Sequence, residues 1–183
     1  VADLLDDFVS GMREGGLSVT LKTFPGIGNV SADVTESIAE NTDSLMTIRD
    51  TNFVPYASGI QAGADCVMVS NAAYSKLTVK KVPAFMSQDI VTKLLREELG
   101  FDGIVMTSPL NDNVIENNYT NEFAVVEAVK AGCDLIVLPG NFKECYEALI
   151  TAVEEGRIDE KVINTSVRRI LQNKIQRGIL VLE

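Results

Sequence analysis

The chain alternates short apolar runs with amphipathic segments whose apolar residues recur every three or four positions. Four runs rich in β-branched and apolar residues predict strands at 18–24, 66–71, 103–108 and 135–139. The last three runs are almost continuously apolar, which is typical of parallel strands buried on both faces. Helical periodicity predicts helices over residues 1–12, 53–63, 88–99, 121–131, 142–155 and 160–177.

Local signals mark where these elements begin and end. Gly15–Gly16 ends the first helix, and Pro55 is tolerated in the first turn of the second. Ser87 is predicted to cap the amino terminus of the third. Polar segments at 25–50, 72–86 and 111–118 are predicted as loops, and loops as long as the first are usually functional or mobile.

Strands that alternate with helices predict an α/β fold in which right-handed crossovers join parallel strands. Two architectures fit this order: a small open doubly wound sheet, or four βα units of a (β/α)₈ barrel. Periodicity alone does not separate them. An open sheet of this kind usually carries a glycine-rich phosphate turn, and no G-x-G-x-x-G follows a predicted strand here.

The composition of the chain restricts the possible functions more than it restricts the possible folds. The 183 residues suffice for one domain with a core, and the net charge of −10 argues against a nucleic-acid partner. No apolar run reaches the roughly 18 residues of a membrane span. The chain opens at Val1 inside a predicted helix, so we expect it to be part of a longer protein.

The residue types present also restrict the chemistry. The absence of histidine excludes His-ligated metals, His acid–base catalysis and a Ser-His-Asp triad. Cys66 and Cys133 adjoin apolar strands and are predicted to be small core residues. The acidic loop 33–50 lacks the ligand spacing of a calcium loop, so no metal or cofactor is predicted.

Lys22 lies in the last turn of the first predicted strand, just before a Pro/Gly loop. In α/β proteins this edge is where ligands bind, which makes Lys22 a candidate for binding. The alternative is a surface lysine beside an ordinary turn, or one that pairs with a carboxylate at a strand end.

The residues around Lys22 resemble a known signature. Lys22–Gly28, K-T-F-P-G-I-G, resembles the K-H-F-P-G-H-G motif of glycoside hydrolase family 3, in its β-N-acetylglucosaminidase-like branch. Segments 53–69, 82–103, 131–135 and 166–171 resemble further family motifs, in order and at family spacing. The resemblance implies that residues 1–183 form one (βα)₄ domain, the second half of a TIM (β/α)₈ barrel.

The same resemblance implies a chemistry. The family contains retaining glycosidases that remove β-linked N-acetylglucosamine, using a carboxylate nucleophile and a proton donor. In this branch the nucleophile is the Asp of a T-D-x-L motif, the acid/base is an Asp-x-His pair, and the Lys-His of the signature contacts the sugar.

This chain departs from that pattern at most of its functional positions. Ser108 stands at the nucleophile position, and Asp33 keeps the carboxylate of the acid/base pair while Thr35 replaces its histidine. The positions carried over as catalytic are therefore Asp33 and Ser108. Those carried over as substrate-binding are Lys22, Thr23 and Asn71, the last two replacing family histidines. We expect Lys22, Asp33, Asn71 and Ser108 to cluster at the carboxyl ends of the strands.

Two functions remain open. The first is a degenerate, non-catalytic domain that retains carbohydrate binding or serves as a scaffold. The second is an active β-N-acetylhexosaminidase whose missing groups come from elsewhere in the barrel or from an unconventional residue such as Asp112. The substitutions favour the first, because the family nucleophile and acid/base histidine belong to this half of the barrel.

The expected partners follow from both readings. The ligand would be a carbohydrate of the N-acetylglucosamine type. An amino-terminal half-barrel or a second copy would cover the inward apolar faces, at Val19, Met68, Val105 and Val137 or their neighbours. Family members are cytoplasmic or else cell-surface and secreted, so the resemblance leaves the compartment open.

Overall fold

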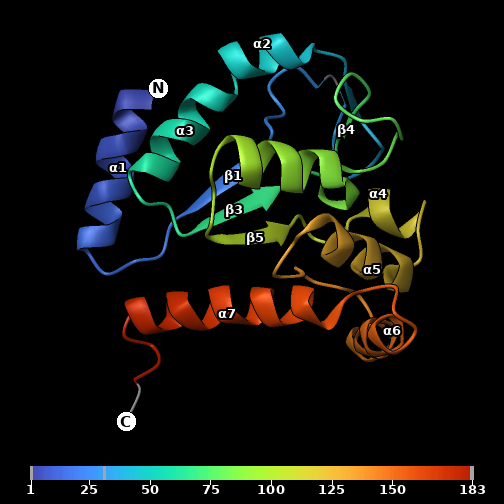
Figure 1. Ribbon diagram of the computed structural model, residues 1–183. Helices are drawn as coiled ribbons and strands as arrows, with labels where there is room; N and C mark the ends of the chain where they lie inside the picture. Colours follow the sequence, from blue (N-terminus) through green and yellow to red (C-terminus); the bar gives the residue numbers. More distant parts are fainter. Residues whose placement is uncertain (1, 31, 182–183) are drawn as a thin grey trace.

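A parallel sheet forms the centre of the molecule. The structure, a computed structural model, describes residues 2–30 and 32–181. Strands β1 (Thr20–Phe24), β3 (Cys66–Val69) and β5 (Ile104–Thr107) lie in the order β1-β3-β5, and both neighbouring pairs are parallel (Figure 1). The α/β class with a parallel sheet is therefore confirmed.

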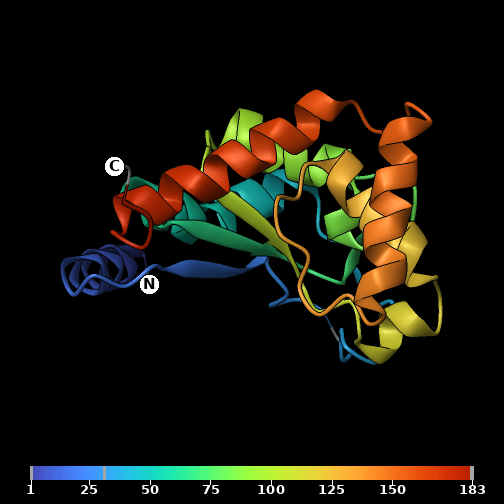
Figure 2. The ribbon, with the colours of Figure 1, turned by 90° about the horizontal axis from the view of Figure 1, so that it is seen from below.

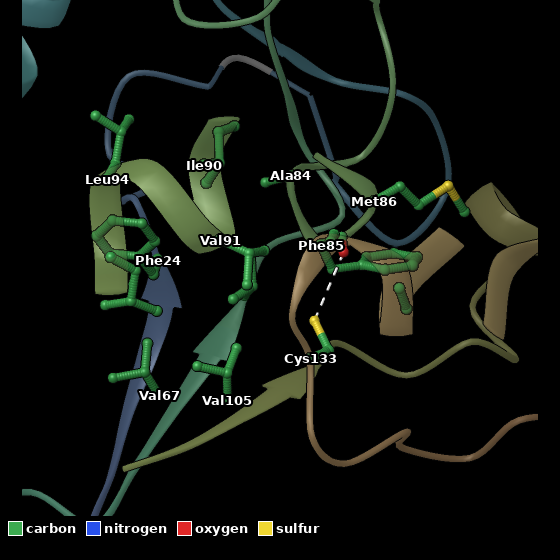
Figure 3. Close-up of a cluster of buried hydrophobic side chains, with 14 of the residues drawn as sticks. Phe24, Val67, Ala84, Phe85, Met86, Ile90, Val91, Leu94, Val105 and Cys133 are labelled. Carbon is green, nitrogen blue, oxygen red and sulfur yellow. Dashed lines mark hydrogen bonds between the residues drawn. The ribbon is translucent and has the colours of Figure 1, made fainter. Parts of the chain in front are cut away.

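The strand register separates the sheet into two different faces. Lys22, Met68 and Met106 stand side by side on one face, and none of them is fully buried. Leu21, Val67 and Val105 form the neighbouring row on the other face and are all buried. Figure 3 shows Val67 and Val105 pointing towards the helix that carries Val91. Since side chains alternate along a strand, one face packs under helices and the other stays partly open.

All six predicted helices are present. They are α1 (Ala2–Glu14), α3 (Phe53–Gln61), η2 (Asp89–Glu98, wound as a π-helix), α5 (Asn121–Ala131), α6 (Phe142–Glu154) and α7 (Glu160–Gln176). Within the described residues, no helix is long and apolar enough to cross a membrane.

The prediction that the Ser87 side chain caps a helix is wrong. Ser87 ends the short 3₁₀ helix η1 (Ala84–Met86), and η2 has no side-chain cap. The backbone carbonyl of Ser87, rather than its hydroxyl, accepts hydrogen bonds from Ile90 and Val91. The two helices follow each other so closely that the backbone of the first supplies the cap of the second.

The fourth predicted strand, 135–139, is reduced to a single parallel bridge between Met106 and Leu135. The segment does run beside β5, because Thr107 N–H donates to the Leu135 carbonyl. The ladder then stops, since Val137 N–H donates to the Thr107 hydroxyl at 3.0 Å instead of to a carbonyl. Leu138 follows with a positive φ of 44°, which turns the chain out of extended geometry.

All three predicted loops contain short regular elements. Two-residue strands β2 (Glu40–Asn41) and β4 (Ala73–Tyr74) pair in parallel, and short helices α2 (Leu45–Asp50) and α4 (Asn113–Glu116) follow. The Ser44 hydroxyl caps α2 by accepting a hydrogen bond from Thr47 N–H at 3.1 Å. These loops are therefore more ordered than their polar composition predicts.

The prediction of an open apolar face at Val19, Met68, Val105 and Val137 is correct for only part of this set. Val19 and Val105 are buried, whereas Met68 and Val137 are half-buried. Met106, the neighbour of Val105, lies beside Met68 on the partly open face. Val105 belongs to the opposite row, which packs under the helices.

Two buried carboxylates tie the amino-terminal ends of the strands to α7. Asp65 accepts a hydrogen bond from Val19 N–H at 2.9 Å and a two-pronged contact from Arg177 at 2.6 Å. Asp134 accepts from Val105 N–H at 2.9 Å and pairs with Arg96 at 2.6 Å and Arg169 at 3.3 Å. Helix α7 therefore lies along the strands at this end, as Figure 2 shows from below.

The three cysteines are free and buried, so the core role predicted for Cys66 and Cys133 is confirmed. The Cys133 thiol points towards the Phe85 carbonyl at 3.6 Å (Figure 3). Burial raises the pKa of Cys133, which keeps the thiol protonated and unreactive.

Replacing Asp65 tests the importance of the buried carboxylates. We expect Asp65→Asn to lower the free energy of unfolding by about 3–5 kcal/mol, because it leaves the Arg177 guanidinium buried without a counter-charge. Urea unfolding followed by circular dichroism measures the change.

Asp102→Asn is the matched control for this substitution. Its side chain is 93% exposed although it also contacts an α7 arginine, so we expect a change of about 1 kcal/mol or less. Equal losses in the two variants would contradict the special role of the buried pair.

Candidate functional site

The carboxyl ends of the strands face the side of the molecule that carries β4, α4 and α5 (Figure 1). Of the five residues carried over from the sequence signature, Asp33, Asn71 and Ser108 lie in the loops that follow β1, β3 and β5, and Lys22 and Thr23 lie on β1 itself. In barrel-type proteins this end of the strands is where sites are built, whereas the opposite end serves stability.

Asn71 and Asp112 form the centre of the candidate site. Asn71 follows β3 and is 1% exposed, and its side-chain N–H donates to the Asp112 carboxylate at 2.8 Å. The carbonyl oxygen of the same amide is buried and has no hydrogen-bond partner among the described residues. Asp112 stands at the N-cap of α4, but its carboxylate does not cap that helix. It is oriented by Asn71 instead.

Asp33 is held by its own loop. The backbone N–H and the hydroxyl of Thr35 both donate to one oxygen of Asp33, at 2.8 and 2.7 Å. These two hydrogen bonds, the backbone one first, hold the pKa of Asp33 below its usual value, so it is ionised at neutral pH. Thr35 therefore acts as a hydrogen-bond donor that orients the Asp33 carboxylate.

The loops of Asp33 and Asp112 are bonded to each other. Val114 N–H donates to the Thr35 carbonyl at 2.8 Å, and the Asn113 amide donates to Glu36 at 2.9 Å. Burial raises the pKa of Asp112, and the charges of Asp33 and Glu36 raise it further, while the hydrogen bond from Asn71 opposes the rise. The site therefore contains two carboxylates whose environments shift their pKa values in opposite directions.

Ser108 follows β5, and its hydroxyl is already engaged in a hydrogen bond. Both its N–H and its Oγ–H donate to the Val69 carbonyl at 2.9 Å, and the residue is 6% exposed. Val69 ends β3, two residues before Asn71. A hydroxyl that donates to a backbone carbonyl, with no base beside it in the contacts described, has no activation as a nucleophile.

Lys22 and Thr23 lie on β1, further from these contacts. The exposed Lys22 shares a row with Met68 and Met106, and the ion pairs of the described residues use other lysines, such as Lys81 and Lys93. The Thr23 hydroxyl is buried without a hydrogen-bond partner among those residues. The Lys22–Thr23 and Phe24–Pro25 peptide bonds are cis.

The structure therefore joins Asn71 to Asp112 directly and the loop of Asp33 to that of Asp112, and it places Ser108 after β5, bonded to the end of β3. Lys22 lies on an adjacent strand without a direct contact to any of them in the described residues. The functional roles carried over for these five positions stay predictions.

Two further polar residues at this end were not identified from the sequence. Asn41 is fully buried, and its side-chain N–H₂ has no partner among the described residues. The Tyr74 hydroxyl donates to the Gly26 carbonyl at 2.9 Å, and burial raises its pKa. Both belong to the small β2–β4 ribbon, which only the pairing of two distant loops creates. The described residues contain no group of three or more potential ligands arranged for a metal ion.

These features define the class of the protein: an α/β, barrel-type domain with polar side chains gathered at the carboxyl ends of its parallel strands. Comparison with known proteins then gives the family. Residues 1–173 match the profile of the glycosyl hydrolase family 3 N-terminal domain, and the chain belongs to this family.

Relatives of known sequence and structure agree with this assignment. The chain is 33% identical over 180 residues to a β-hexosaminidase of Stenotrophomonas maltophilia K279a, covering 98% of this chain and 50% of that protein. It is 33% identical over 138 residues to a β-hexosaminidase of Xylella fastidiosa M23, covering 75% of this chain and 41% of the relative. The chain thus spans half or less of the length of these curated relatives.

A solved structure of similar sequence supports the fold. The family 3 β-N-acetylglucosaminidase of Paenibacillus sp. FPU-7 superposes with a TM-score of 0.93 at 33% identity, over 100% of this chain and 36% of that one. The β-N-acetylhexosaminidase of Beutenbergia cavernae gives 0.84 at 30% identity, over 92% and 50%. The α/β fold with its parallel sheet is thus that of a family 3 domain.

Titration of Asp112 tests the electrostatics of the site. Asn71→Leu removes the hydrogen bond to the ionised carboxylate while keeping the position filled, so we expect the pKa of Asp112 to rise further. Asp33→Asn removes a neighbouring negative charge, so we expect the pKa to fall.

Carboxyl ¹³C NMR shifts followed against pH measure both changes. Glu147→Gln, on the outer surface of α6, is the control and should leave the titration of Asp112 where it is. Shifts of the same sign in Asn71→Leu and Asp33→Asn would contradict the assignment of these contacts.

Proposed function

We propose that this domain binds a saccharide of the β-linked N-acetylhexosamine type and does not hydrolyse it. The observation that supports the proposal most directly is Ser108. It occupies the position of the family's nucleophilic Asp, it cannot ionise at neutral pH, and its hydroxyl donates to the Val69 carbonyl. No covalent intermediate of the retaining mechanism can form on a group in this state.

The proton donor is also altered. Asp33 is ionised and receives both hydrogen bonds that Thr35 donates to it. A threonine at this position has no proton to give near neutral pH, so the leaving oxygen of a glycoside would depart without assistance. Loss of the nucleophile alone costs on the order of 10⁴-fold or more in rate.

Binding makes smaller demands on the same residues. A neutral saccharide needs hydrogen-bond donors and acceptors rather than a nucleophile. The Asn71 carbonyl oxygen and the Thr23 hydroxyl have no partner among the described residues, and Lys22, next to Thr23 on β1, is exposed. These groups support a role in contacting hydroxyl or acetamido groups.

The second candidate function is residual glycosidase activity that uses Asp112. Its raised pKa is a property that proton donors in glycosidases share, and this favours Asp112 over any other carboxyl group of the site. Asp112 lies four residues beyond Ser108 and is oriented by Asn71. A carboxylate displaced by about 1 Å already costs on the order of 10²-fold in rate.

Turnover of an aryl β-N-acetylglucosaminide decides between the two candidates. On the full natural protein that carries this chain, we expect no release of the aryl group at family rates. Ser108→Asp combined with Thr35→His, and then with Thr23→His, restores the family's groups and should raise the rate.

Asp112→Asn in the natural protein is the control for the second candidate. It should change nothing if the domain is non-catalytic and should abolish turnover if Asp112 is the acid. Unaltered protein that hydrolyses the substrate at ordinary rates would contradict the proposal.

We also propose that residues 1–183 act as the second half of a barrel whose amino-terminal half covers β1. Within the described residues β1 pairs only with β3, so its other edge is open. A hollow of about 300 Å³ beside that edge is lined by Leu5, Phe8, Val19 and Leu21 among others. Phe8 is 58% exposed there. An open parallel edge beside apolar side chains is a template for another strand.

Light scattering on the purified chain, alone and mixed with the amino-terminal half of the family barrel, tests this assembly. We expect a complex heavier than the 19.9 kDa chain, which Phe8→Asp weakens by about tenfold or more because it puts a charge into the apolar contact. Val79→Asp, at a residue 99% exposed elsewhere, is the control.

A chain that stays monomeric in the presence of that half would contradict the assembly. A complex of two copies of this chain would show instead that a second copy covers the edge.

A further inference from the structure

A small hollow lies between η2 and α7, beside the ion pairs of Asp134 at the amino-terminal end of the strands. Its volume is about 270 Å³, and Gly132 lines it together with side chains of both helices. Pockets that take drug-sized ligands are usually larger, roughly 300–1,000 Å³. The size of this hollow therefore fits a small molecule or an ion.

The charged side chains that line the hollow are all cations: Arg96, Lys161 and Arg169. Asp134 and Asp102, which pair with the two arginines, are not part of its lining. Among the ion pairs of the described residues, those that involve a lysine use other lysines than Lys161. Three cations in one hollow create a locally positive potential in a chain whose net charge is −10, and such a potential attracts anions.

Arg96 has one hydrogen-bond donor that the fold does not use. A guanidinium group carries five N–H donors. The two terminal nitrogens donate to the carbonyls of Phe101, Gly103 and Gly132 at 3.3, 3.2 and 3.0 Å and to the Asp134 carboxylate at 2.6 Å. The Nε atom is buried and has no partner among the described residues. An unmade hydrogen bond at a buried charged group costs free energy, which an acceptor placed there would recover.

Gly132 leaves space beside this donor. Its φ of 111° lies in the left-handed region, and a Cβ at this position would lie 3.0 Å from Thr92 Oγ1 and 3.8 Å from Arg96 Nε. On the side of α7, Ser166 brings a hydroxyl group to the same hollow. An open space with an unpartnered N–H on one side and a hydroxyl on the other suits the oxygen atoms of an anion.

The electrostatics of Arg96 agree with this interpretation. Burial lowers its pKa, the Asp134 carboxylate opposes the fall, and the charge of Arg169 adds to it. Asp134 is shared by both guanidinium groups, at 2.6 Å from Arg96 and 3.3 Å from Arg169. A second anion beside the two arginines would therefore bring the local charge closer to balance.

We propose that this hollow binds a small oxyanion of the phosphate class. Lys161 and Arg169 supply the positive charge, and the Arg96 Nε–H and the Ser166 hydroxyl donate hydrogen bonds to the anion. The bound anion joins η2 to α7 at the end of the strands that serves stability, so it stabilises the folded protein. This site is separate from the Asn71–Asp112 pair and does not depend on saccharide binding.

Calorimetric titration with inorganic phosphate at constant ionic strength tests the site, on the full natural protein that carries this chain. The protein should bind phosphate, and its unfolding temperature should rise when phosphate replaces chloride. Lys161→Gln should weaken binding by about tenfold, because it removes a charge-assisted hydrogen bond from an exposed side chain. Ser166→Ala removes a neutral hydrogen bond and should weaken binding by about fivefold.

Lys174→Gln is the matched control. Lys174 is an exposed lysine on the same helix, and its substitution changes the net charge equally, but it does not line the hollow. This variant should bind phosphate as the unaltered protein does. As a check that needs no variant, phosphate should shift the NMR signal of the Arg96 Nε–H group. The signal of Arg157, whose Nε already donates to Glu155 at 2.7 Å, should not move.

Methyl phosphate distinguishes the two sources of such an anion. Weaker binding of methyl phosphate than of phosphate supports a site for the free ion, and equal or tighter binding supports a site for the phosphate group of a larger molecule.

Three results would overturn the proposal. The first is a full protein that does not bind phosphate at constant ionic strength. The second is an equal loss of binding in Lys161→Gln and Lys174→Gln, or no loss in either, since both results show that the hollow does not hold the anion. The third is phosphate binding that leaves the Arg96 Nε–H signal unchanged. All three leave the proposed saccharide binding untouched.

Discussion

The arrangement of the strands depends on the hydrogen bonds and ion pairs of two buried carboxylates, Asp65 and Asp134. Each follows a helix that ends at a glycine with positive φ, 92° at Gly63 and 111° at Gly132, and each is followed directly by extended chain. The carboxylate then accepts from the N–H of a neighbouring extended segment and from an arginine of α7. A buried carboxylate without such partners would be costly, so chain direction and α7 position are fixed together.

The two ends of the strands are therefore held by different kinds of contact. Ion pairs and close backbone contacts hold the amino-terminal ends of the strands; a Cβ on Gly103 would come within 2.5 Å of the Asp65 carbonyl oxygen. At the opposite end, single hydrogen bonds such as Val114 to Thr35 join separate loops. Substitutions at that end change the chemistry of the site without disturbing the contacts that align the strands. Ser108 and Thr35, the positions predicted to differ from the family pattern, both lie at this end, away from the contacts that align the strands.

The sequence predicted the elements whose signals are local and periodic. The six helices and three of the four strands repeat an apolar pattern over many residues. The sequence could not predict where the fourth strand ends. There the Val137 N–H donates to the Thr107 hydroxyl instead of to a backbone carbonyl, and this contact forms only in the folded protein. The β2–β4 ribbon likewise depends on two loops that meet only in the fold. In the predicted loop 25–50, the serine at position 44 was a local signal for the start of α2, because its hydroxyl accepts from Thr47 N–H.

The candidate site shows the same division between local and tertiary information. Motif positions located Asn71, Asp33 and Ser108, but their partners were decided by three-dimensional contacts: Asn71 with Asp112, Thr35 with Asp33, and Ser108 with Val69. An amide at position 71 does not ionise, so it donates to Asp112 at every pH, unlike an imidazole. Its unpartnered carbonyl oxygen costs about 1–3 kcal/mol of desolvation in the free protein. A ligand that donates a hydrogen bond to that oxygen recovers this free energy on binding, whereas bond cleavage would gain nothing from it. The unpartnered oxygen of Asn71 is therefore an argument for the proposed binding of a saccharide.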